Sequence, residues 1–282
     1  MHAQLSPGQR FERILLATEG SNFSQGADRV AMDMATLCHA EILAMTMVAN
    51  NDEYAALAPE RLRQDECAAW AHLSAVREQG ERRGLNCTIR VCHGVEPADA
   101  ILKVAHEACA DLVVMGRRGR RGLWSRLLIG QATSMVVGQA SRKVLVVPQN
   151  AGIWRQRILL AIDGSRHGDA AAATALRLAR VGGVPLSVLT VIRSNHAAER
   201  RAMAEQAVDR VARFARQEGV VVEGWVEAGD PAAVVIETAG RLEADLIVGG
   251  GFGHTHLRDR ILGGVIERII GNASCPVLVV NG

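Results

Sequence analysis

A glycine-rich segment near the C-terminus has the residue types and spacing of an anion-binding loop. It reads GGFGHTHLRDRILGG over residues 250–264 and directly follows the apolar run at 245–248. Backbone N–H groups at a helix N-terminus bind anions, and glycine lets the backbone approach a ligand without an intervening Cβ. The segment therefore predicts a cradle for phosphate, with a plain turn and helix cap as the alternative.

The first half of the chain carries a less regular version of this loop, GRRGRRGLWSRLLIGQ at residues 116–131. Gly116 and Gly119 repeat the spacing of Gly250 and Gly253, but ten residues then precede Gly130, whereas nine separate Gly253 from Gly263. A solvated loop or contacts to phosphate would both explain its arginines, which are Arg117, Arg118, Arg120, Arg121 and Arg126. Neither half contains GxxxxGK[ST], nor GxGxxG after its first apolar run.

Other residues with chemical potential are better explained structurally. His254 and His256 lack a third ligand at a convincing spacing, so we expect no metal site. Ser21 and Ser165 each precede a helical pattern and are expected to be N-caps rather than nucleophiles. His93 is interpreted as structural, and Asp163 either binds a ligand or holds N–H groups of its own loop.

The sequence segments that must position these residues occur twice in the chain. ERILLATEGS at 12–21 recurs as QRILLAIDGS at 156–165, and KVLVV at 143–147 recurs as PVLVV at 276–280. GVEPADAILKVAHEACADLVVMG at 94–116 likewise aligns with residues 228–250. Internal repeats of this kind indicate duplicated domains, and we place them at residues 1–150 and 151–282.

Each copy alternates continuous apolar runs with amphipathic helical patterns. Continuous runs are typical of strands buried on both faces of a parallel sheet. We therefore predict an α/β fold of two doubly wound domains, each an open five-stranded parallel sheet with helices on both faces. The segment 51–84 is expected to be a crossing helix whose core-facing residues, by spacing, are Ala56, Leu62, Cys67, Trp70, Leu73 and Val76.

Composition narrows the class of protein. The 282 residues are 49% hydrophobic with a formal charge of +2, which argues against disorder and against nucleic acid as a partner. The N-terminus lacks the apolar stretch of a signal peptide, and no apolar run approaches the length of a membrane span. Six cysteines without a CxxC pair fit a reduced cytoplasm, where we expect the protein to be located.

The spacing Gly-x2-Gly-x9-Gly after the fourth apolar run resembles the nucleotide-binding loop of the universal stress protein family. The opening ILLA(T/I)(D/E)GS and the closing VLVV run of each copy are also similar to that family. The chain thus resembles a tandem universal stress protein, and the resemblance implies the fold of the adenine nucleotide alpha hydrolases with ATP, ADP or AMP as bound ligand.

The family's nucleotide-binding residues fall on both copies. In the second, preferred half they fall on Asp163, Val191, Gly249, Gly250, Gly253, Gly263, Gly264 and Val265. In the first half they fall on Glu19, Met115, Gly116, Gly119, Gly130 and Gln131. Residues at two positions of the family's pattern differ from the usual types. Glu19 stands where the family usually has Asp. Gly264 and Gln131 stand where it has the Ser or Thr that donates to phosphate.

The resemblance implies a non-catalytic ATP-binding protein in which any hydrolysis is slow. It also implies that the two domains pair through their fifth strands, residues 144–147 and 277–280. Whether two chains associate further is left open. The departures motivate an alternative, a degenerate scaffold that binds an apolar small molecule or a protein. A phosphotransferase or adenylyl transferase is disfavoured because no Walker lysine, SGGxDS motif or paired-carboxylate metal site is present.

Overall fold

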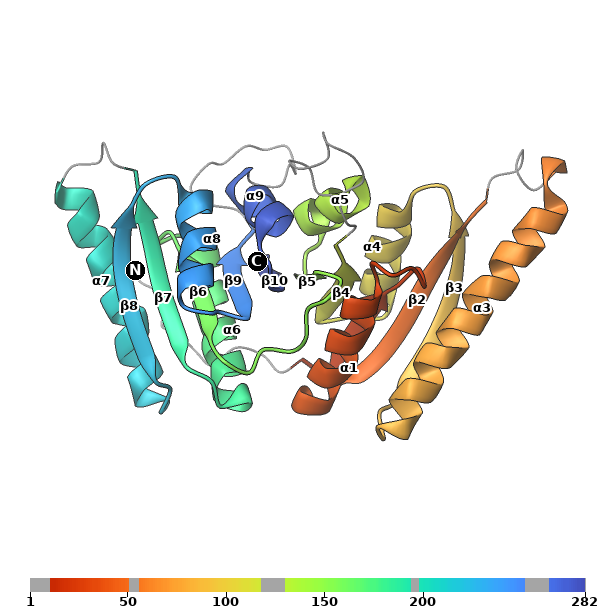
Figure 1. Ribbon diagram of the computed structural model, residues 1–282, viewed down its shortest axis with the longest axis horizontal. Coiled ribbons are helices and arrows are strands. Elements are labelled where there is room, and N and C mark those ends of the chain that lie inside the picture. Colours follow the sequence, from red (N-terminus) through yellow and green to blue (C-terminus); the bar gives the residue numbers. More distant parts are fainter. Residues whose placement is uncertain (1–10, 51–55, 118–129, 194–197, 252–263, 282) are drawn as a thin grey trace. The chain divides into compact units, whose positions relative to one another are not determined.

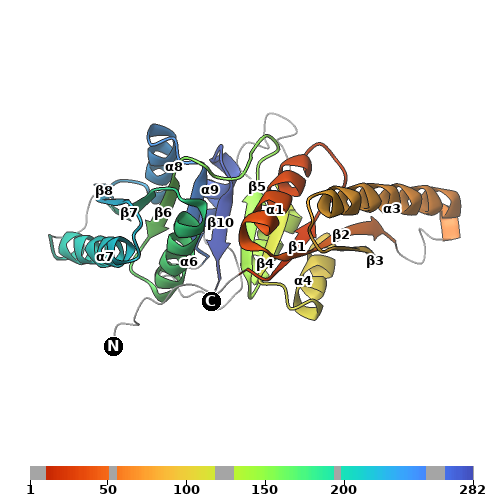
Figure 2. The ribbon, with the colours of Figure 1, turned by 90° about the horizontal axis from the view of Figure 1, so that it is seen from below.

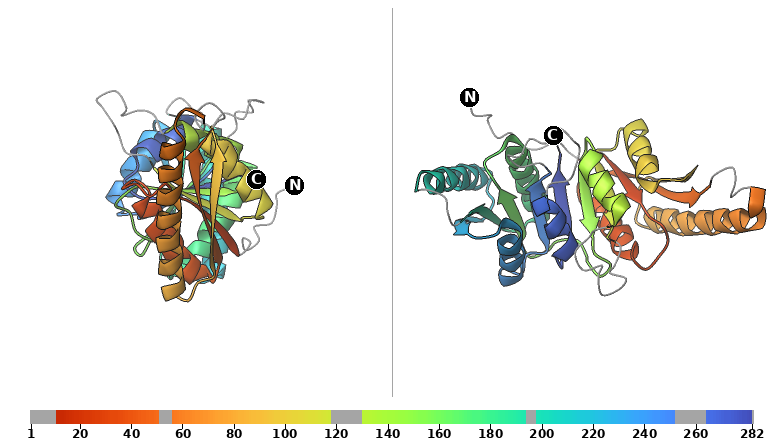
Figure 3. Two further views of the ribbon diagram at one scale, coloured as in Figure 1. Left: turned by 90° about the vertical axis from the view of Figure 1, so that its right-hand side faces the viewer. Right: turned by 90° about the horizontal axis from the view of Figure 1, so that it is seen from above.

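The computed structural model describes residues 11–50, 56–117, 130–193, 198–251 and 264–281. The described residues form two compact units, one of residues 11–117 and 130–152 and the other from Ile153 onward. Figures 1 and 3 show helices packed against a sheet in each unit.

The first unit is an open, all-parallel sheet of five strands. These are β1 (Arg13–Ala17), β2 (Glu41–Ala49), β3 (Cys87–Gly94), β4 (Leu112–Gly116) and β5 (Lys143–Val147), in the order β3-β2-β1-β4-β5. Its helices are α1 (Gln25–Cys38), α3 (Pro59–Arg82), α4 (Pro97–Glu107) and α5 (Gln131–Gln139). Right-handed crossovers put α1 and α3 on one face and α4 on the other (Figure 2).

The second unit repeats this arrangement. Its parallel strands are β6 (Ile158–Ile162), β7 (Leu186–Ile192), β8 (Val222–Ala228), β9 (Leu246–Gly250) and β10 (Val277–Val280), in the order β10-β9-β6-β7-β8. Its helices are α6 (Arg166–Gly182), α7 (Ala198–Gln217), α8 (Pro231–Arg241) and α9 (Gly264–Asn272). The predicted duplicated, doubly wound α/β fold is confirmed.

The strand register reproduces the sequence repeat. Ile14 pairs with Ile42 in the first unit, and Ile158 pairs with Leu186 in the second, so both strands are offset by 144 residues (158 − 14 and 186 − 42). In both units the strand order reverses between the first and fourth strands. Open α/β sheets bind ligands beyond the carboxyl ends of the strands at this reversal. The candidate residues should therefore gather there.

The central strands are held by burial on both faces. Leu15, Leu16, Leu159 and Leu160 are all fully buried. Two adjacent strand residues point to opposite faces, so burial of both shows that helices cover the sheet on each side. The continuous apolar runs of the sequence are explained by this two-sided cover. Among the described helices, none is long and apolar enough to cross a membrane.

The prediction for the crossing helix α3 is wrong over its first half. Leu73 and Val76 are buried and Leu62 is half-buried, but Ala56, Cys67 and Trp70 are exposed. A helix of 24 residues spans about 36 Å, whereas the nine residues of β2 span about 30 Å. Figure 1 shows α3 extending past the strands beside it. In this half the partly covered positions, Leu62, Glu66 and Ala69, continue the spacing that leads to Leu73, so Cys67 and Trp70 lie to the side of the covered face.

A close backbone contact fixes α1 against the chain that follows β5. A Cβ on Gly26 would lie 2.1 Å from the carbonyl oxygen of Pro148 and 2.8 Å from that of Gln149. Arg29, one turn further along α1, donates to the carbonyl oxygen of Ala151 at 2.9 Å. Only glycine at position 26 allows this approach.

Gly26→Ala is therefore expected to lower the free energy of unfolding by at least about 2 kcal/mol, because backbone must shift to admit the Cβ. Gly240→Ala is the matched control, since Gly240 is also helical and a Cβ added there would have no atom within 4 Å. That substitution should raise the free energy of unfolding by about 0.5–1 kcal/mol. Urea unfolding of both variants measures the two signs, and equal effects would contradict the packing argument.

Candidate functional site

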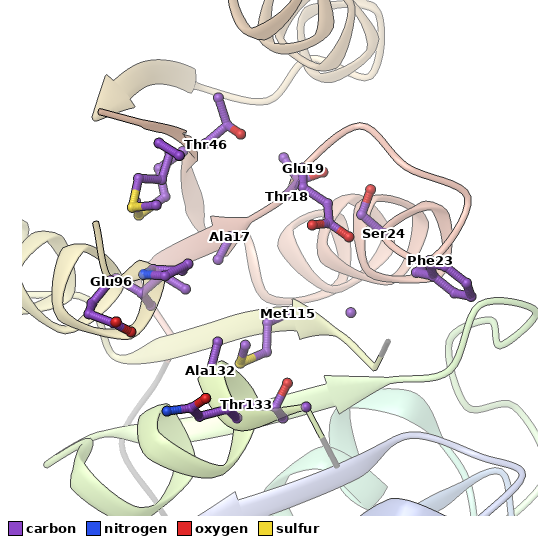
Figure 4. Close-up of a pocket in the computed structure, with 18 of the residues that line it drawn as sticks. Ala17, Thr18, Glu19, Phe23, Ser24, Thr46, Glu96, Met115, Ala132 and Thr133 are labelled. Carbon is purple, nitrogen blue, oxygen red and sulfur yellow. The ribbon is translucent and has the colours of Figure 1, made fainter. Parts of the chain in front are cut away.

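A cavity of about 450 Å³ opens at the carboxyl edge of the first unit, where the strand order reverses. Its walls come from the ends of β1, β2 and β4, from residues 95–97 at the start of α4, and from the first turn of α5. Figure 4 shows Ala17 and Met115 between the side chains contributed by these elements. The cavity thus occupies the position at which a doubly wound sheet binds ligands.

The lining combines apolar surface with buried hydroxyl groups. Three methionines, Met45, Met47 and Met115, supply flexible thioether side chains that adapt to flat or irregular ligands. The hydroxyl-bearing residues Thr18, Ser24, Thr46 and Thr133 also line the cavity and are at most 7% exposed. A mostly apolar lining with a few fixed polar groups is typical of small-molecule sites.

One end of the cavity is the N-terminus of α5. Gly130 is the N-cap of this nine-residue helix, and its first residues, Gln131, Ala132 and Thr133, line the cavity. The unpaired N–H groups of a first helical turn and the positive end of the helix dipole favour an anionic group there. Figure 4 labels Ala132 and Thr133 at this wall.

Most of the first-unit residues expected from the sequence come together at this cavity. Glu19, Met115, Gly116, Gly130 and Gln131 all line it, while Gly119 lies outside the described residues. Sequence reasoning missed Thr46, Met47 and Thr133. A signal for Met47 is present in the repeat, because the offset of 144 makes it the equivalent of Val191, a candidate in the second half.

In the second unit the described candidates occupy corresponding ends of strands. Asp163 follows β6, Val191 lies near the end of β7, and Gly249 and Gly250 end β9. Gly264 and Val265 begin α9. Gly253 and Gly263 lie outside the described residues, as do His254 and His256.

Gly116 and Gly250 have a packing role that explains why they are glycines. A Cβ on Gly116 would lie 2.6 Å from the carbonyl oxygen of Phe23, and one on Gly250 would lie 3.0 Å from Cβ of His167. Phe23 and His167 are equivalent in the repeat. The end of the fourth strand is thus pressed against the loop after β1 in the first unit and against the first turn of α6 in the second. For Gly264, by contrast, no atom of the part of the chain that the structure describes lies within 4 Å of the Cβ position.

The acidic residues after the first strands hold their loops differently. The Oδ1 atom of Asp163 accepts the backbone N–H of Ser165 at 3.0 Å, whereas Oε1 of Glu19 accepts the hydroxyl of Ser21 at 2.8 Å. The extra methylene of Glu19 carries its carboxylate past the backbone to a side chain. Both contacts show that these acids organise their loops.

The two predicted N-caps have different outcomes. Ser165 is the N-cap of α6 and accepts the N–H of Gly168 at 3.1 Å, as predicted. The prediction for Ser21 is wrong, because α1 begins only at Gln25. The Ser21 hydroxyl is instead engaged by Glu19 and by the N–H of Phe23 at 3.2 Å.

A model of the universal stress protein family matches residues 10–148 and again residues 155–281. The chain belongs to the universal stress protein family. Each match coincides with one complete five-stranded sheet, so this universal stress protein carries two family domains in tandem.

Similar proteins agree with this assignment. A universal stress protein of Mycolicibacterium smegmatis is 29% identical over 288 residues, covering 95% of this chain and 96% of that protein. One from Methanocaldococcus jannaschii is 43% identical over 77 residues, which are 27% of this chain and 45% of that protein. The crystal structure of a universal stress protein from Archaeoglobus fulgidus has the same fold, with a TM-score of 0.75 at 21% identity over 95% of this chain and 98% of that one.

The N-cap residues of α4 and α8, Glu96 and Asp230, are equivalent in the repeat but have different surroundings. Glu19 and Glu96 line the first-domain cavity, and no Lys, Arg or His is present among its described lining residues. In the second domain the counterpart of Glu96 is Asp230, which receives both terminal nitrogens of Arg268, at 2.9 and 2.8 Å. These hydrogen bonds lower the pKa of the Asp230 carboxyl, and Arg193 adds a smaller effect in the same direction.

Behind the first-domain cavity lies a polar cluster in which Thr18 is buried and Asp28 and His72 are half-buried. Thr18 Oγ1 is 2.9 Å from Nε2 of His72, and Thr18 also hydrogen-bonds to the carboxylate of Asp28. Burial raises the pKa of Asp28 above its ordinary value, and Thr18, His72 and Arg29 only partly oppose it. The Oδ1 atom of Asp28 has no hydrogen-bond partner among the described residues.

His93 has a structural position, as interpreted from the sequence. Its Nε2 lies 2.7 Å from Oε1 of Glu66, which links β3 to α3. Within the described residues there is no group of three or more potential metal ligands.

The raised pKa of Asp28 predicts a pH-dependent effect on stability. A raised folded-state pKa means that the stability this group contributes is fully present below the unfolded value of 3.8 and is lost as pH rises through the folded value. Asp28→Asn should therefore exceed wild type in free energy of unfolding at pH 8, with the difference shrinking as pH falls toward 4.

The matched control for this measurement is Asp33→Asn, on the same helix. Asp33 forms an ion pair with Arg83 at 2.6 Å and is partly exposed. Its substitution should not raise stability at pH 8. Urea unfolding between pH 4 and pH 8 tests both variants, and a constant difference for Asp28→Asn across that range would refute the assignment.

Proposed function

We propose that this universal stress protein binds an adenine nucleotide at the carboxyl edges of its sheets and acts as a non-catalytic binding module in the cytoplasm. The observation that carries the proposal is the cavity at the strand reversal of the first domain, with the first turn of α5 at one end. Bound nucleotide would serve as a signal of cell state, and any hydrolysis would be slow.

The chemistry of the cavity suits each part of a nucleotide. Its volume of about 450 Å³ lies within the range of small-molecule sites. Methionine side chains offer an apolar surface to a base, and the Thr46 hydroxyl, which also lines the cavity, could hydrogen-bond a sugar. The N–H groups at the start of α5 would face phosphate.

Three features support the second domain as the stronger site for ATP. The family's glycine spacing is regular there. The cations Arg193 and Arg268 act on Asp230 at its rim, whereas the described rim of the first domain carries Glu19 and Glu96. The hydroxyl of Thr190 is buried without a partner among the described residues, and its counterpart Thr46 lines the first-domain cavity.

Titration calorimetry with ATP tests the proposal domain by domain. Ala132→Trp should fill the first-domain cavity and remove its binding, and Val265→Trp at the equivalent position of α9 should weaken binding in the second domain at least about tenfold. Gln139→Trp, at the exposed far end of α5, is the matched control and should bind like wild type.

Wild type should also be stabilised by about 2.7 kcal/mol at an ATP concentration of 100 Kd, since the ligand binds only the folded chain. If neither calorimetry nor thermal unfolding responds to ATP, the nucleotide proposal is refuted. The alternative scaffold, with the methionine-lined cavity taking an apolar ligand, would then stand.

Position 264 allows a gain of affinity to be tested. Gly264 starts α9, and no atom of the described residues lies within 4 Å of its Cβ position, so serine at 264 would clash with none of them. A hydroxyl donated to phosphate is worth about 1.5–3 kcal/mol. Gly264→Ser should therefore bind ATP at least about tenfold more tightly than Gly264→Ala, which adds the Cβ alone. Equal affinities would show that residue 264 does not contact phosphate.

A further inference from the structure

One side of α3 carries small and aromatic side chains that the rest of the described first domain leaves exposed. Cys67, Ala68, Ala71 and Ala75 lie on this outward side, and Trp70 beside them is 50% exposed. Figure 1 shows α3 along the outer end of the first sheet, where it packs against β2 and β3. Tryptophan is enriched at protein interfaces, because it buries a large apolar surface there. The outward side of α3 is therefore a surface against which another helix could pack.

The equivalent helix of the second domain has different residue types at these positions. The buried residues of α3 and α7 align at an offset of 135 residues, because Leu73 corresponds to Val208 (208 − 73). At this offset, Trp70, Ala71 and Ala75 of α3 correspond to Glu205, Gln206 and Arg210 of α7. Long polar side chains of this kind are typical of a solvated helix face. The small and aromatic surface is thus particular to the first domain.

Polar residues on the outward side of α3 are placed symmetrically about Ala71. Glu60 precedes Ala71 by 11 residues, and Arg82 follows it by 11 (71 − 60 and 82 − 71). Gln64 precedes it by 7, and Glu78 follows it by 7 (71 − 64 and 78 − 71). Spacings of 7 and 11 residues are about two and three turns of an α-helix, so all five residues lie on one side. All five are exposed.

This symmetry fits an antiparallel pair of α3 helices from two copies of the chain. A two-fold axis at Ala71 brings a residue that precedes Ala71 level with the partner's residue that follows it by the same number of positions. Glu60 then lies beside the partner's Arg82, and Gln64 lies beside the partner's Glu78. Each contact occurs twice, because the axis repeats it. The small side chains at the centre allow the two helices to approach closely.

One flank of this surface is self-complementary as well. Trp70 follows Arg63 by 7 residues and precedes Glu81 by 11 (70 − 63 and 81 − 70), so these three residues share one side of the helix. The same axis brings Arg63 within one turn of the partner's Glu81. It also brings Trp70 within one turn of the partner's Trp70, where the two indole rings can pack together.

The ion pairs that these residues make within one chain do not oppose such an exchange. Arg63 is 3.2 Å from Glu60, and Arg77 is 3.6 Å from Glu81, with all four side chains at least 45% exposed. Exposed pairs of this kind contribute little to stability, so their charges are available to a partner at little cost. On the opposite flank, Arg61 is 3.3 Å from Asp65 and leaves no net charge there.

We propose that two copies of this chain associate through α3, antiparallel about a two-fold axis at Ala71. Trp70 of each copy packs against the partner's Trp70, and Arg63 pairs with the partner's Glu81. The association does not depend on nucleotide.

Sedimentation velocity of the full chain, from about 1 to 200 µM, tests the association. Wild type should dimerise, and Trp70→Ala should raise the dimer Kd at least about tenfold, because the central aromatic contact is lost. Met203→Ala is the matched control, since Met203 is an apolar side chain of α7 that is 59% exposed, and its Kd should equal that of wild type. A monomeric wild type, or a dimer Kd that Trp70→Ala leaves unchanged, would overturn the proposal.

Charge reversal tests the orientation and register of the pair. Arg63→Glu and Glu81→Arg should each raise the dimer Kd at least about tenfold, because like charges then meet across the axis. An equimolar mixture of these two variants should associate at least about tenfold more tightly than either variant alone, since opposite charges meet again in the mixed dimer. A folding defect in either variant would not be rescued by mixing. Equal Kd values for the mixture and the separate variants would overturn the proposed pairing.

Discussion

Close packing of the end of the fourth strand against the segment that leads from the first strand into the first helix is the constraint on which each domain depends. Gly116 lies against the carbonyl oxygen of Phe23, in the loop before α1, and Gly250 lies against His167, in the first turn of α6. A side chain at either glycine would push this segment away from the sheet. The segment's position determines how the first helix packs and how the wall at the strand reversal is placed. The same contact thus shapes both the fold and the candidate site.

The two domains share this packing contact but differ in the residues around it. In the first domain, Met115 at the end of β4 and Thr133 in the first turn of α5 line the cavity. The residues at the equivalent positions of the second domain are Gly249 and Ile266. Cδ1 of Ile266 lies 3.5 Å from the Cβ position of Gly249, so a larger residue on the helix accompanies the smaller one on the strand. The partners of Glu96 and Asp230, the N-cap residues of α4 and α8, differ as well. The two domains thus differ in the residues that surround a shared frame.

Much of the fold could be predicted from the sequence because its determinants are local or repeated. Continuous apolar runs and the two aligned copies are enough to predict parallel, doubly wound domains. The start of α1 could not be predicted, because the Ser21 hydroxyl is engaged by the longer side chain of Glu19. Trp70 is exposed because it lies beside the helical face that continues to Leu73, and its apolar side chain alone gives no sign of this.

The candidate site could likewise be predicted from the sequence only in part. Glu19 and Gly130 can be selected from motifs, and the structure places them around one cavity. The glycine motif predicts a ligand contact at Gly116, but the packing of this residue against Phe23 is a tertiary contact that spacing cannot reveal. The cluster of Asp28 and His72 joins two helices distant in sequence and belongs to no motif.

Photo-crosslinking with an azido derivative of ATP, followed by peptide mapping, tests the central claim most directly. The account predicts labels in the peptides that carry residues 17–24 or 45–49 of the first domain, or 161–168 or 189–193 of the second, and their loss when unmodified ATP is added in excess. Labelling confined to other peptides, or labelling that excess ATP does not suppress, would contradict it.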